Sequence, residues 1–521
     1  MIRAFQLLRS LLVLLLALLA AGPLAAQSFC TPVAAQATAG GTVLGNGSPG
    51  SVTTAMIQAA LDAGGAITFN LGSNPSTIVL TSTLTVSRDV VLDGGGLVTL
   101  SGGDARRILR IINTNPNANA PVFTVTLQHL NLLDARVSDG RGAAIFADFN
   151  QTFPHKINLS LVDVDIVNSD APLDGSSQDD GGGALYALLL NRIDIADSRF
   201  QNNTGSNGGA VYSLGTLAVN IVDSAFIGNQ AIGTGGNPGN GGNAGGLGVD
   251  GAARLLDVCR TRFVDNTSNA FGAGFFSVMY DTQSRSRFED VLFQGNRQLS
   301  STQHTGGAYI QDGPFALERV AFINNEANGF GGLFVAGSAS GMIRNATFAG
   351  NVARQGLGAA MALTNTAPIQ IVNSTIANNV ATAAFAAGIS INAPNQLTLT
   401  NTIFANNSGG NVFVNWAMNN PAQFDGGGNM QWPQVRSGGG GNETPVTASA
   451  SFADAMLGAV ANNGGPTPTL AMASNSPARD TGVNTASVPS LDQRGYPRDA
   501  ARDRGAFEFG AEGLLFRDSF E

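Results

Sequence analysis

Apolar and polar positions in the middle of the chain repeat with a period of about 28 residues. Each repeat carries a bulky apolar anchor, an Asn three positions after it, and another apolar residue five positions before it. The anchors and their Asn partners are Phe200 and Asn203, Phe226 and Asn229, Phe263 and Asn266, Phe293 and Asn296, Phe322 and Asn325, Phe348 and Asn351, Ile376 and Asn379, and Phe404 and Asn407. Around each anchor, apolar and polar residues alternate over four or five positions, which predicts short β-strands and no helix of useful length.

Repeats of this kind gain stability by stacking, because each one buries the apolar face of the one before it. Stacking in register places Phe on Phe in the interior. It also places Asn on Asn at a bend, where Asn tolerates left-handed backbone angles and its amide can bond the next Asn. One turn per about 28 residues predicts a parallel β-helix, since propeller blades need ~40–45 residues. We expect the coil over residues 40–430.

The two ends of such a coil expose open sheet edges that must be covered. Residues 51–62 predict a short capping helix with Met56, Ala59, Ala60 and Ala63 on its apolar face. Short strands are expected after it, at residues 66–69, 78–80, 84–86, 90–92 and 97–100. At the other end, the Gly- and Asn-rich residues 411–442 break the repeat.

The repeats resemble the right-handed parallel β-helix superfamily, which includes pectate lyases, polygalacturonases and bacterial surface proteins. Their Phe-x-x-Asn and Gly-Gly-Ala pattern is also similar to polymorphic outer-membrane-protein repeats. The resemblance implies an all-β fold class, a right-handed parallel β-helix (solenoid) with an N-terminal capping helix and a small C-terminal module.

The C-terminal segment resembles the choice-of-anchor module of secreted bacterial β-helix proteins. The residues that carry this resemblance are NNGGPTPTL at 462–470, SPARDTG at 476–482, DQRG at 492–495 and DRGAFE at 503–508. The resemblance implies a module over residues 431–510, followed by a short tail at 511–521. Residues 514–521, LLFRDSFE, are similar to a short C-terminal tail of some secreted Gram-negative proteins.

The N-terminus predicts export. Arg3 and Arg9 give a positive start, Leu11 to Ala21 form an apolar run, and small residues precede Gln27. This is the pattern of a secretory signal peptide, here residues 1–26, and the run is too short to span a ~30 Å hydrocarbon core comfortably. No later segment is long and apolar enough to cross a membrane. We therefore expect a secreted or cell-surface protein, from a Gram-negative bacterium.

The composition limits the kinds of molecule that this chain can bind. The 521 residues carry a formal net charge of −9, which argues against a nucleic-acid partner because that would require a basic surface. The chain has two cysteines, Cys30 and Cys259. They pair only if the fold brings the mature N-terminus beside the middle of the chain, and the alternative is two free thiols.

Two groups of charged residues are candidates for ligand binding. Asp170, Asp174, Asp179 and Asp180 form an acidic stretch that could hold Ca²⁺ through oxygen ligands, although the spacing is not that of an EF-hand. The alternative is a solvated loop. Arg260, Arg262, Arg285 and Arg287 would form a basic stripe able to bind acidic glycans, if their faces align. The alternative is surface pairing with Glu289, Asp290 and Glu318.

No catalytic constellation is visible in the sequence. A polygalacturonase-like site would need a Gly-His-Gly motif, and none of His129, His155 and His304 is flanked by Gly on both sides. We expect a non-catalytic monomer that displays loops for adhesion or for binding a polysaccharide or cell-surface glycan, without a cofactor other than a candidate calcium ion. Trp416, Trp432 and Tyr280 could stack on sugars, although two tryptophans near the C-terminal end of a coil are more typical of a plug. The alternative is a polysaccharide lyase or glycoside hydrolase acting on an acidic polysaccharide.

The signal-peptide pattern yields a direct prediction: the mature protein begins at Gln27 and is found outside the inner membrane. N-terminal sequencing of the protein from the periplasm, the outer membrane and the medium tests this. A chain that starts at Met1 in the cytosolic fraction would contradict it. A variant that lacks residues 514–521 serves to test the tail separately, because a sorting signal would leave the truncated protein in the periplasm.

Overall fold

The computed structural model describes residues 30–149, 153–172, 179–235, 241–251, 254–280, 284–302, 304–364, 367–410, 415–434 and 444–511. The predicted signal peptide, Asp174 and the tail at 514–521 lie outside the described residues. The chain divides into two compact units, Met1–Thr31 and Pro32–Glu521, and the architecture below is that of the second.

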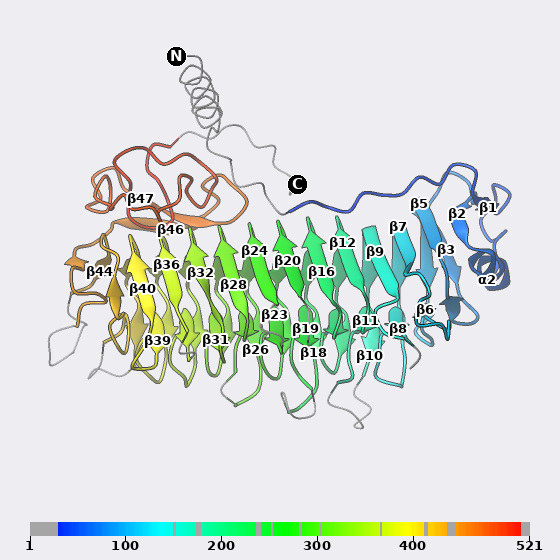
Figure 1. Cartoon of the computed structure of the whole chain (residues 1–521), viewed down its shortest axis with the longest axis horizontal. Helices are drawn as coiled ribbons and strands as arrows, with labels where there is room; N and C mark the ends of the chain where they lie inside the picture. Colours follow the sequence, from blue (N-terminus) through cyan, green and yellow to red (C-terminus); the bar gives the residue numbers. More distant parts are fainter. Residues whose placement is uncertain are drawn as a thin grey trace, which may run out of the picture. The chain divides into compact units, whose positions relative to one another are not determined.

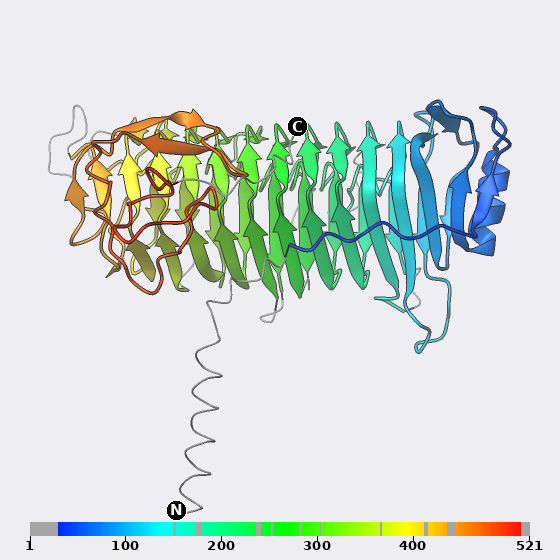
Figure 2. The same cartoon turned by 90° about the horizontal axis from the view of Figure 1, so that it is seen from above.

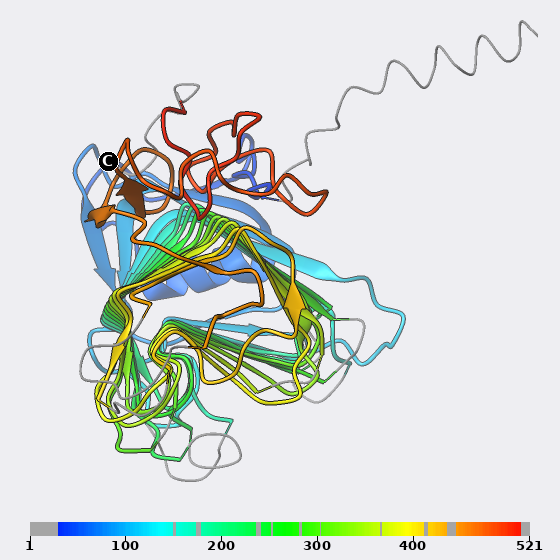
Figure 3. The same ribbon diagram turned by 90° about the vertical axis from the view of Figure 1, so that its left-hand side faces the viewer.

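The described strands stack into a right-handed parallel β-helix, as the repeat predicted (Figure 1). Viewed along the coil, successive turns superpose, with three sheets around one interior (Figure 3). We call the sheets A, B and C. In a full turn the chain passes from sheet C through a loop to sheet B, then through two consecutive strands of sheet A, and back to sheet C.

Sheet B has one strand per turn: β4 (Leu84–Val86), β6 (Leu109–Ile112), β8 (Ile145–Asp148), β11 (Leu185–Leu188), β15 (Val211–Leu214), β19 (Leu247–Gly251), β23 (Phe275–Met279), β27 (Ala308–Gln311), β31 (Leu333–Ala336), β35 (Met361–Leu363) and β39 (Ile389–Ile391). Sheet C consists of two-residue strands: β10 (Asp170–Ala171), β14 (Thr204–Gly205), β18 (Gln230–Ala231), β22 (Thr267–Ser268), β26 (Arg297–Gln298), β30 (Glu326–Ala327), β34 (Val352–Ala353), β38 (Val380–Ala381) and β42 (Ser408–Gly409).

Sheet A begins with β1 (Thr42–Leu44), β2 (Gly65–Phe69), β3 (Ser76–Val79) and the long strands β5 (Val90–Ser101), β7 (Phe123–Leu133) and β9 (Ile157–Val167). It continues with β12 (Arg192–Ala196), β13 (Arg199–Gln201), β16 (Ala218–Val222), β17 (Ala225–Ile227), β20 (Leu255–Cys259), β21 (Arg262–Val264), β24 (Arg285–Glu289), β25 (Leu292–Gln294), β28 (Pro314–Glu318), β29 (Ala321–Ile323), β32 (Ser340–Arg344), β33 (Thr347–Ala349), β36 (Ile369–Val372), β37 (Thr375–Ala377), β40 (Leu397–Thr400), β41 (Ile403–Ala405), β43 (Phe424–Asp425), β44 (Met430–Trp432) and β45 (Ser451–Phe452).

The anchor residues form a continuous aromatic column in the interior, which confirms the expected stacking. From Phe200 to Phe348, adjacent rings lie 4.6–5.0 Å apart between centroids, at interplanar angles of 4–13°. Ile376 and Phe404 continue the same register. In-register parallel pairing sets this spacing, because neighbouring strands lie ~4.8 Å apart. The column is therefore a direct consequence of the repeat period.

The Asn residues that follow the anchors form a buried ladder at one corner. From Asn203 to Asn379, the side-chain Nδ2 donates to Oδ1 of the Asn one turn later at 2.9–3.0 Å. The same Oδ1 also accepts the backbone N–H of the previous Asn at 3.0–3.2 Å. All eight are buried. The expected column of stacked, amide-bonded Asn is confirmed.

The left-handed backbone, however, lies one residue earlier than we expected. The residues just before the ladder have φ of 53–67°, whereas none of the eight ladder residues, all of them described, has a positive φ. These left-handed positions are Asn202, Gly228, Asp265, Gly295, Asn324, Gly350, Asn378 and Asn406. The reason is that a ladder residue must present its own N–H to the amide above it. The turn is made by the residue before it, which is Asn, Asp or Gly because these tolerate this region.

The N-terminal end is covered by one described helix, α2 (Thr54–Ala63), which begins after Thr53 as its N-cap and ends at Gly64. Its buried side chains include Ile57, Ala60 and Leu61. Our predicted apolar face was therefore wrong except for Ala60, since Met56, Ala59 and Ala63 are exposed. The stripe at i, i+3 and i+4 that faces the coil starts at Ile57. Within the described residues, no helix has the length and apolar character needed to cross a bilayer.

Two segments cover the outside of sheet A. Residues 32–41 run along it in extended form (Figure 2), where Gln36 and Gln128 exchange hydrogen bonds of 2.7 and 2.9 Å. Residues 444–511, which include the hairpin β46 (Leu457–Ala461) and β47 (Thr469–Met472), pack against the last turns. Leu470 and Phe507 share one apolar cluster with Ala349 and Ile403 of the coil.

Several residues of the C-terminal segment, among them Gln493 and Glu508 of the motifs, are buried in this packing. Arg498 and Glu508 form an ion pair of 2.8 Å with side chains 0% and 2% exposed. Gln493 accepts the Thr347 hydroxyl at 2.6 Å, across to the coil. Removing one partner of a buried ion pair lowers the stability of the fold, because the other charge is left buried without compensation. These contacts therefore hold the segment in place. Elsewhere, Cys30 and Cys259 are each disulfide-bonded and neither is a free thiol.

The aromatic column makes a testable prediction about stability. Phe322 is fully buried and stacked on both sides, so Phe322→Ala should lower the free energy of unfolding by about 3–5 kcal/mol. Denaturant unfolding of the wild type and the variant measures this, with the exposed Leu299→Ala as control. A loss below about 1 kcal/mol would contradict the role of this ring in the core.

Candidate functional site

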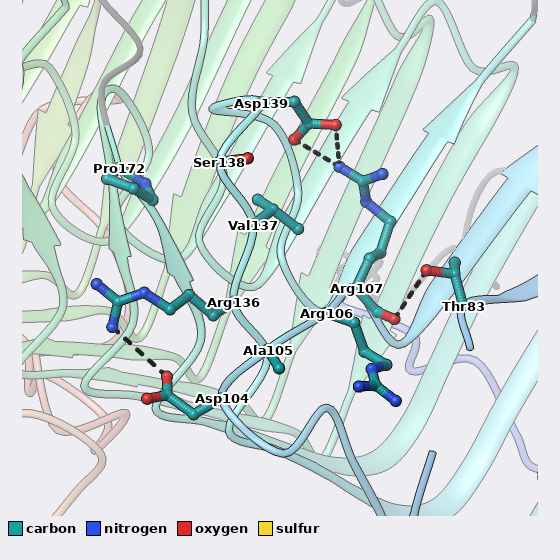
Figure 4. Close-up of a pocket in the computed structure, with 10 residues that line it drawn as sticks. All are labelled: Thr83, Asp104, Ala105, Arg106, Arg107, Arg136, Val137, Ser138, Asp139 and Pro172. Carbon is teal, nitrogen blue, oxygen red and sulfur yellow. Dashed lines mark hydrogen bonds and ion pairs between the residues drawn. The ribbon is translucent and has the colours of Figure 1, made fainter. Parts of the chain in front are cut away.

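A polar cavity of about 520 Å³ opens where the first turns enter sheet B. It is lined by Thr83, Asp104, Ala105, Arg106, Arg107, Arg136, Val137, Ser138, Asp139 and Pro172, and we call it the arginine cavity (Figure 4). Its walls come from the segments before β4, β6 and β8 and from the residue after β10. The repeat stacks these equivalent segments on one another, so residues far apart in sequence border one space.

The three arginines of the cavity have different partners. Arg107 bonds both carboxylate oxygens of Asp139 at 2.7 Å (Figure 4). Arg136 lies 3.5 Å from Asp104 and 3.2 Å from Asp170, with half of its side chain exposed. Arg106 donates to the backbone carbonyl of Leu80, and within the described residues it has no carboxylate partner. The cavity thus carries three guanidinium groups and two carboxylates among its lining residues.

Polar and aromatic side chains continue from the cavity onto the outer face of sheet B. Neighbouring strands place Arg110, Phe146, Tyr186 and Tyr212 in one outward-facing row. Their inward neighbours belong to the core, whereas Phe146, Tyr186 and Tyr212 form a cluster of their own. The Arg110 guanidinium lies 4.0 Å from the centre of the Phe146 ring, a cation–π contact. This face is therefore built from groups that can bind ligands.

Each arginine beside this row also holds an aspartate. Arg110 bonds Asp148 at 2.8 Å, and Arg141 bonds Asp180 at 2.8 Å while its guanidinium lies 5.7 Å from the Tyr186 ring. Asp148 is 9% exposed, and its Oδ1 has no hydrogen-bond partner among the residues that the structure describes. Burial is the largest cause that raises the pKa of the Tyr186 phenol, so this hydroxyl stays protonated at neutral pH.

Further along the row, Asp250 joins two tyrosines. Its Oδ2 accepts the Tyr212 hydroxyl at 3.1 Å, and Tyr280 also hydrogen-bonds to it. Asp250 is 3% exposed, and burial raises the pKa of its carboxyl, while the two tyrosine hydrogen bonds oppose this and Asp179 adds to it. A buried carboxyl of this kind is retained only where hydrogen bonds compensate for its lost hydration.

The structure separates the residues of the predicted acidic stretch. Asp170 faces Arg136, and Asp180 is 1% exposed and faces Arg141, so neither lies in a solvated loop. The pKa of Asp170 is raised, mainly by burial. The nearby Asp104 adds to this shift, whereas Arg136 opposes it. Within the described residues there is no group of three His, Cys, Asp or Glu suited to a metal ion. Asp174 lies outside the described residues, so calcium binding stays a prediction.

The predicted basic stripe is largely paired with carboxylates. Arg260 makes two hydrogen bonds to Asp223, at 2.6 and 2.8 Å, and Arg287 makes two to Asp257, at 2.7 and 2.8 Å. Arg262 and Arg285 lie on β21 and β24 of sheet A. Arg260 and Arg287 therefore follow the pairing alternative, but with Asp223 and Asp257 in place of the carboxylates that we expected. Glycan binding by these four arginines remains a prediction.

Sequence reasoning missed the arginine cavity and the row on sheet B. Residues 101–180 follow the repeat only loosely, so the sequence does not show which of their side chains share a face. The sequence did offer one signal for Asp250. It directly follows a stretch in which Gly246 and Gly248 alternate with Leu247 and Val249. Gly248 leaves room for the Tyr212 ring, because an added Cβ would lie 2.7 Å from it.

The comparisons with known proteins concern the coil. A family model described as "Right handed beta helix region" matches residues 276–424. No curated protein matches the chain by sequence. Among solved structures, PfbA, a surface adhesin of Streptococcus pneumoniae, is 11% identical, with 73% of this chain and 93% of that chain covered and a TM-score of 0.34.

Two further structures show a similar level of likeness. The tailspike protein 3 of bacteriophage CBA120 is 10% identical, covering 79% of this chain and 56% of that one at a TM-score of 0.34. Pectate lyase Pel9A is 12% identical, with 90% of this chain and 95% of that chain covered and a TM-score of 0.31. At such identities and TM-scores these structures carry no information on the activity of this chain.

The buried Asp250 predicts a pH-dependent stability. Because its pKa in the folded state is raised above 3.8, ionisation penalises the folded state, so wild-type stability falls as pH rises from 3.8 through the raised value. Asp250→Asn lacks this penalty, and its stability relative to wild type should increase over that window. Denaturant unfolding at a series of pH values tests this, with the exposed Asp62→Asn as control. A difference that stays constant with pH would show that Asp250 titrates alike in both states.

Proposed function

We propose that this chain is an exported bacterial β-helix protein that binds acidic polysaccharide or cell-surface glycan without cleaving it, through the arginine cavity. The observation that carries the proposal is that Arg106, Arg107 and Arg136 all line one cavity of about 520 Å³. Guanidinium groups bind carboxylates through paired, charge-assisted hydrogen bonds, and uronate sugars carry such carboxylates. The coil serves as a rigid support that displays this cavity.

Local charge supports an anionic ligand. The whole chain has a net charge of −9 and would repel a polyanion, so binding needs a region where positive charge is concentrated. The cavity supplies an excess of one guanidinium over carboxylates among its lining residues. At physiological salt, electrostatic attraction between exposed charges is largely screened beyond ~8 Å. Direct contacts between the ligand and these arginines would therefore contribute most of the binding energy.

Arg106 is the arginine best placed for a ligand carboxylate. Its hydrogen bond goes to the Leu80 carbonyl, and a guanidinium with five N–H donors retains capacity for further bonds. Arg107 and Arg136, in contrast, already face aspartates. Asp104 and Asp139 offer acceptors for sugar hydroxyls next to these donors. The site thereby fits a sugar that carries both a carboxylate and hydroxyl groups.

The alternative function is a polysaccharide lyase or glycoside hydrolase acting on the same class of polymer. It is favoured by one observation, the buried carboxyls of Asp148 and Asp250 on sheet B and of Asp180 in the segment before β11. Incubation with polyuronates and neutral polysaccharides, with and without Ca²⁺, separates the two. Release of shortened chains would replace the binding proposal with the enzymatic one.

The cavity predicts how substitution affects binding. Arg106→Gln should weaken the affinity for a polyuronate such as polygalacturonate about tenfold, since a hydrogen bond to a charged group contributes ~1.5–3 kcal/mol. Arg136→Gln, a surface change that leaves the Leu80 contact intact, should weaken it as well. Titration calorimetry measures both.

The matched control is Arg297→Gln, an arginine on sheet C whose side chain is 56% exposed. It should bind like wild type. The proposal would be contradicted if both cavity variants bound the polyuronate as tightly as the wild type does. It would also be contradicted if the wild type bound a neutral polysaccharide as tightly as the polyuronate.

A further inference from the structure

Tyr280 is an exposed aromatic residue at the outer end of a strand in sheet B. It follows β23, and its backbone N–H donates to the Gly251 carbonyl at 3.3 Å. Its side chain is 67% exposed, whereas Tyr212 and Phe276 on the same face are 1% exposed. A large aromatic side chain left in solvent beside buried ones gains nothing from packing. Its position therefore invites a functional explanation.

The phenol of Tyr280 is held by a buried group. Asp250, 3% exposed, hydrogen-bonds Tyr280 and also accepts the Tyr212 hydroxyl at 3.1 Å. Tyr212 reaches this carboxyl by leaning over Gly248, where any added Cβ would lie 2.7 Å from its ring. Two tyrosines, one from the turn before Asp250 and one from the turn after it, thus meet at one carboxyl. Restricting an exposed ring before a ligand arrives reduces the entropy lost on binding.

The surroundings of Tyr280 are polar. The Tyr309 hydroxyl donates to Gln311 at 2.6 Å, and the Gln311 amide donates to Asp312 at 3.2 Å. Tyr309 and Gln311 lie on β27, which pairs with β23, and Gln311 is opposite Val278, two residues before Tyr280. An aromatic face bordered by amide and carboxylate groups matches a sugar ring, which has an apolar C–H face and a rim of hydroxyls. A protein partner would instead favour a wider apolar patch.

We propose that Tyr280 is the stacking platform of a second glycan subsite, with Asp250 as its positioning residue. The inference rests on the proposed function, because it assigns the ligand of this subsite to the same polysaccharide chain. The arginine cavity lies where the chain enters sheet B and Tyr280 lies where the chain leaves it, and from β6 to β23 the coil advances five turns, ~24 Å at ~4.8 Å per strand. One extended polysaccharide chain spans the arginine cavity and Tyr280, and a disaccharide does not.

The test compares a polygalacturonate polymer with its disaccharide on the full chain. Tyr280→Ala should weaken polymer binding by about threefold to tenfold, the range of an aromatic contact. Tyr280→Trp should restore it, because an aromatic face is retained. Tyr280→Phe keeps the ring but loses the bond to Asp250, so its affinity should lie between these two. The disaccharide, which binds the arginine cavity, should be weakened by Arg106→Gln and not by Tyr280→Ala.

A second readout reports contact directly. In Tyr280→Trp, the indole fluorescence should change as polymer is added and should not change with disaccharide. Leu299→Ala, also an exposed apolar residue at 53%, is the control for a non-specific surface effect. Polymer binding by Tyr280→Ala equal to wild type, while Arg106→Gln is weakened, would overturn this inference alone. Failure of the wild type to bind any polyuronate would overturn the proposed function as well.

Discussion

The structure depends on the hydrogen bond between one Asn side chain and the next. Each turn buries a primary amide at the same corner, and a buried amide without partners costs about 1–3 kcal/mol. Here the Oδ1 of every Asn after Asn203 accepts two N–H groups from the turn before, and each Nδ2 also donates to a backbone carbonyl, such as Phe200 for Asn229. These bonds exist only if successive turns are in register. The ladder thus links stability to the repeat period.

The same corner imposes a second constraint, on the residue before each Asn. A left-handed backbone limits it to Asn, Asp or Gly, and in most of the ladder a side chain and a Gly alternate from turn to turn. The carboxamide of Asn324 occupies the place above Gly350, where an added Cβ would lie 2.1 Å from its Oδ1. Similarly, an added Cβ on Gly295 would lie 2.2 Å from Oδ1 of Asp265. At these turns a second side chain would collide with the one on the turn before, whereas Asn378 and Asn406 follow each other on the last two turns.

Because the interior is occupied by stacked columns, function is left to the outer faces and corners. The outside of sheet A is covered in part by residues 32–41 and, at the last turns, by residues 444–511. The outer face of sheet B instead carries arginine, aspartate and tyrosine side chains next to the arginine cavity. The ion pairs Arg110–Asp148 and Arg141–Asp180 hold these side chains in fixed positions. A regular coil in this way supports an irregular polar surface.

The sequence by itself determined the coil and both stacked columns, because a repeated unit makes the same contacts at every turn. Phe322 and Asn325 could be placed from their spacing alone. It did not determine the helix face at Ile57, the left-handed position before each Asn, or the residues around the cavity. Arg106, Arg136 and Tyr280 have no repeated partners, and their neighbours come from turns linked by loops of unequal length. Only the tertiary structure decides which of these side chains meet, since contact between turns depends on the path of each loop and not on a local pattern.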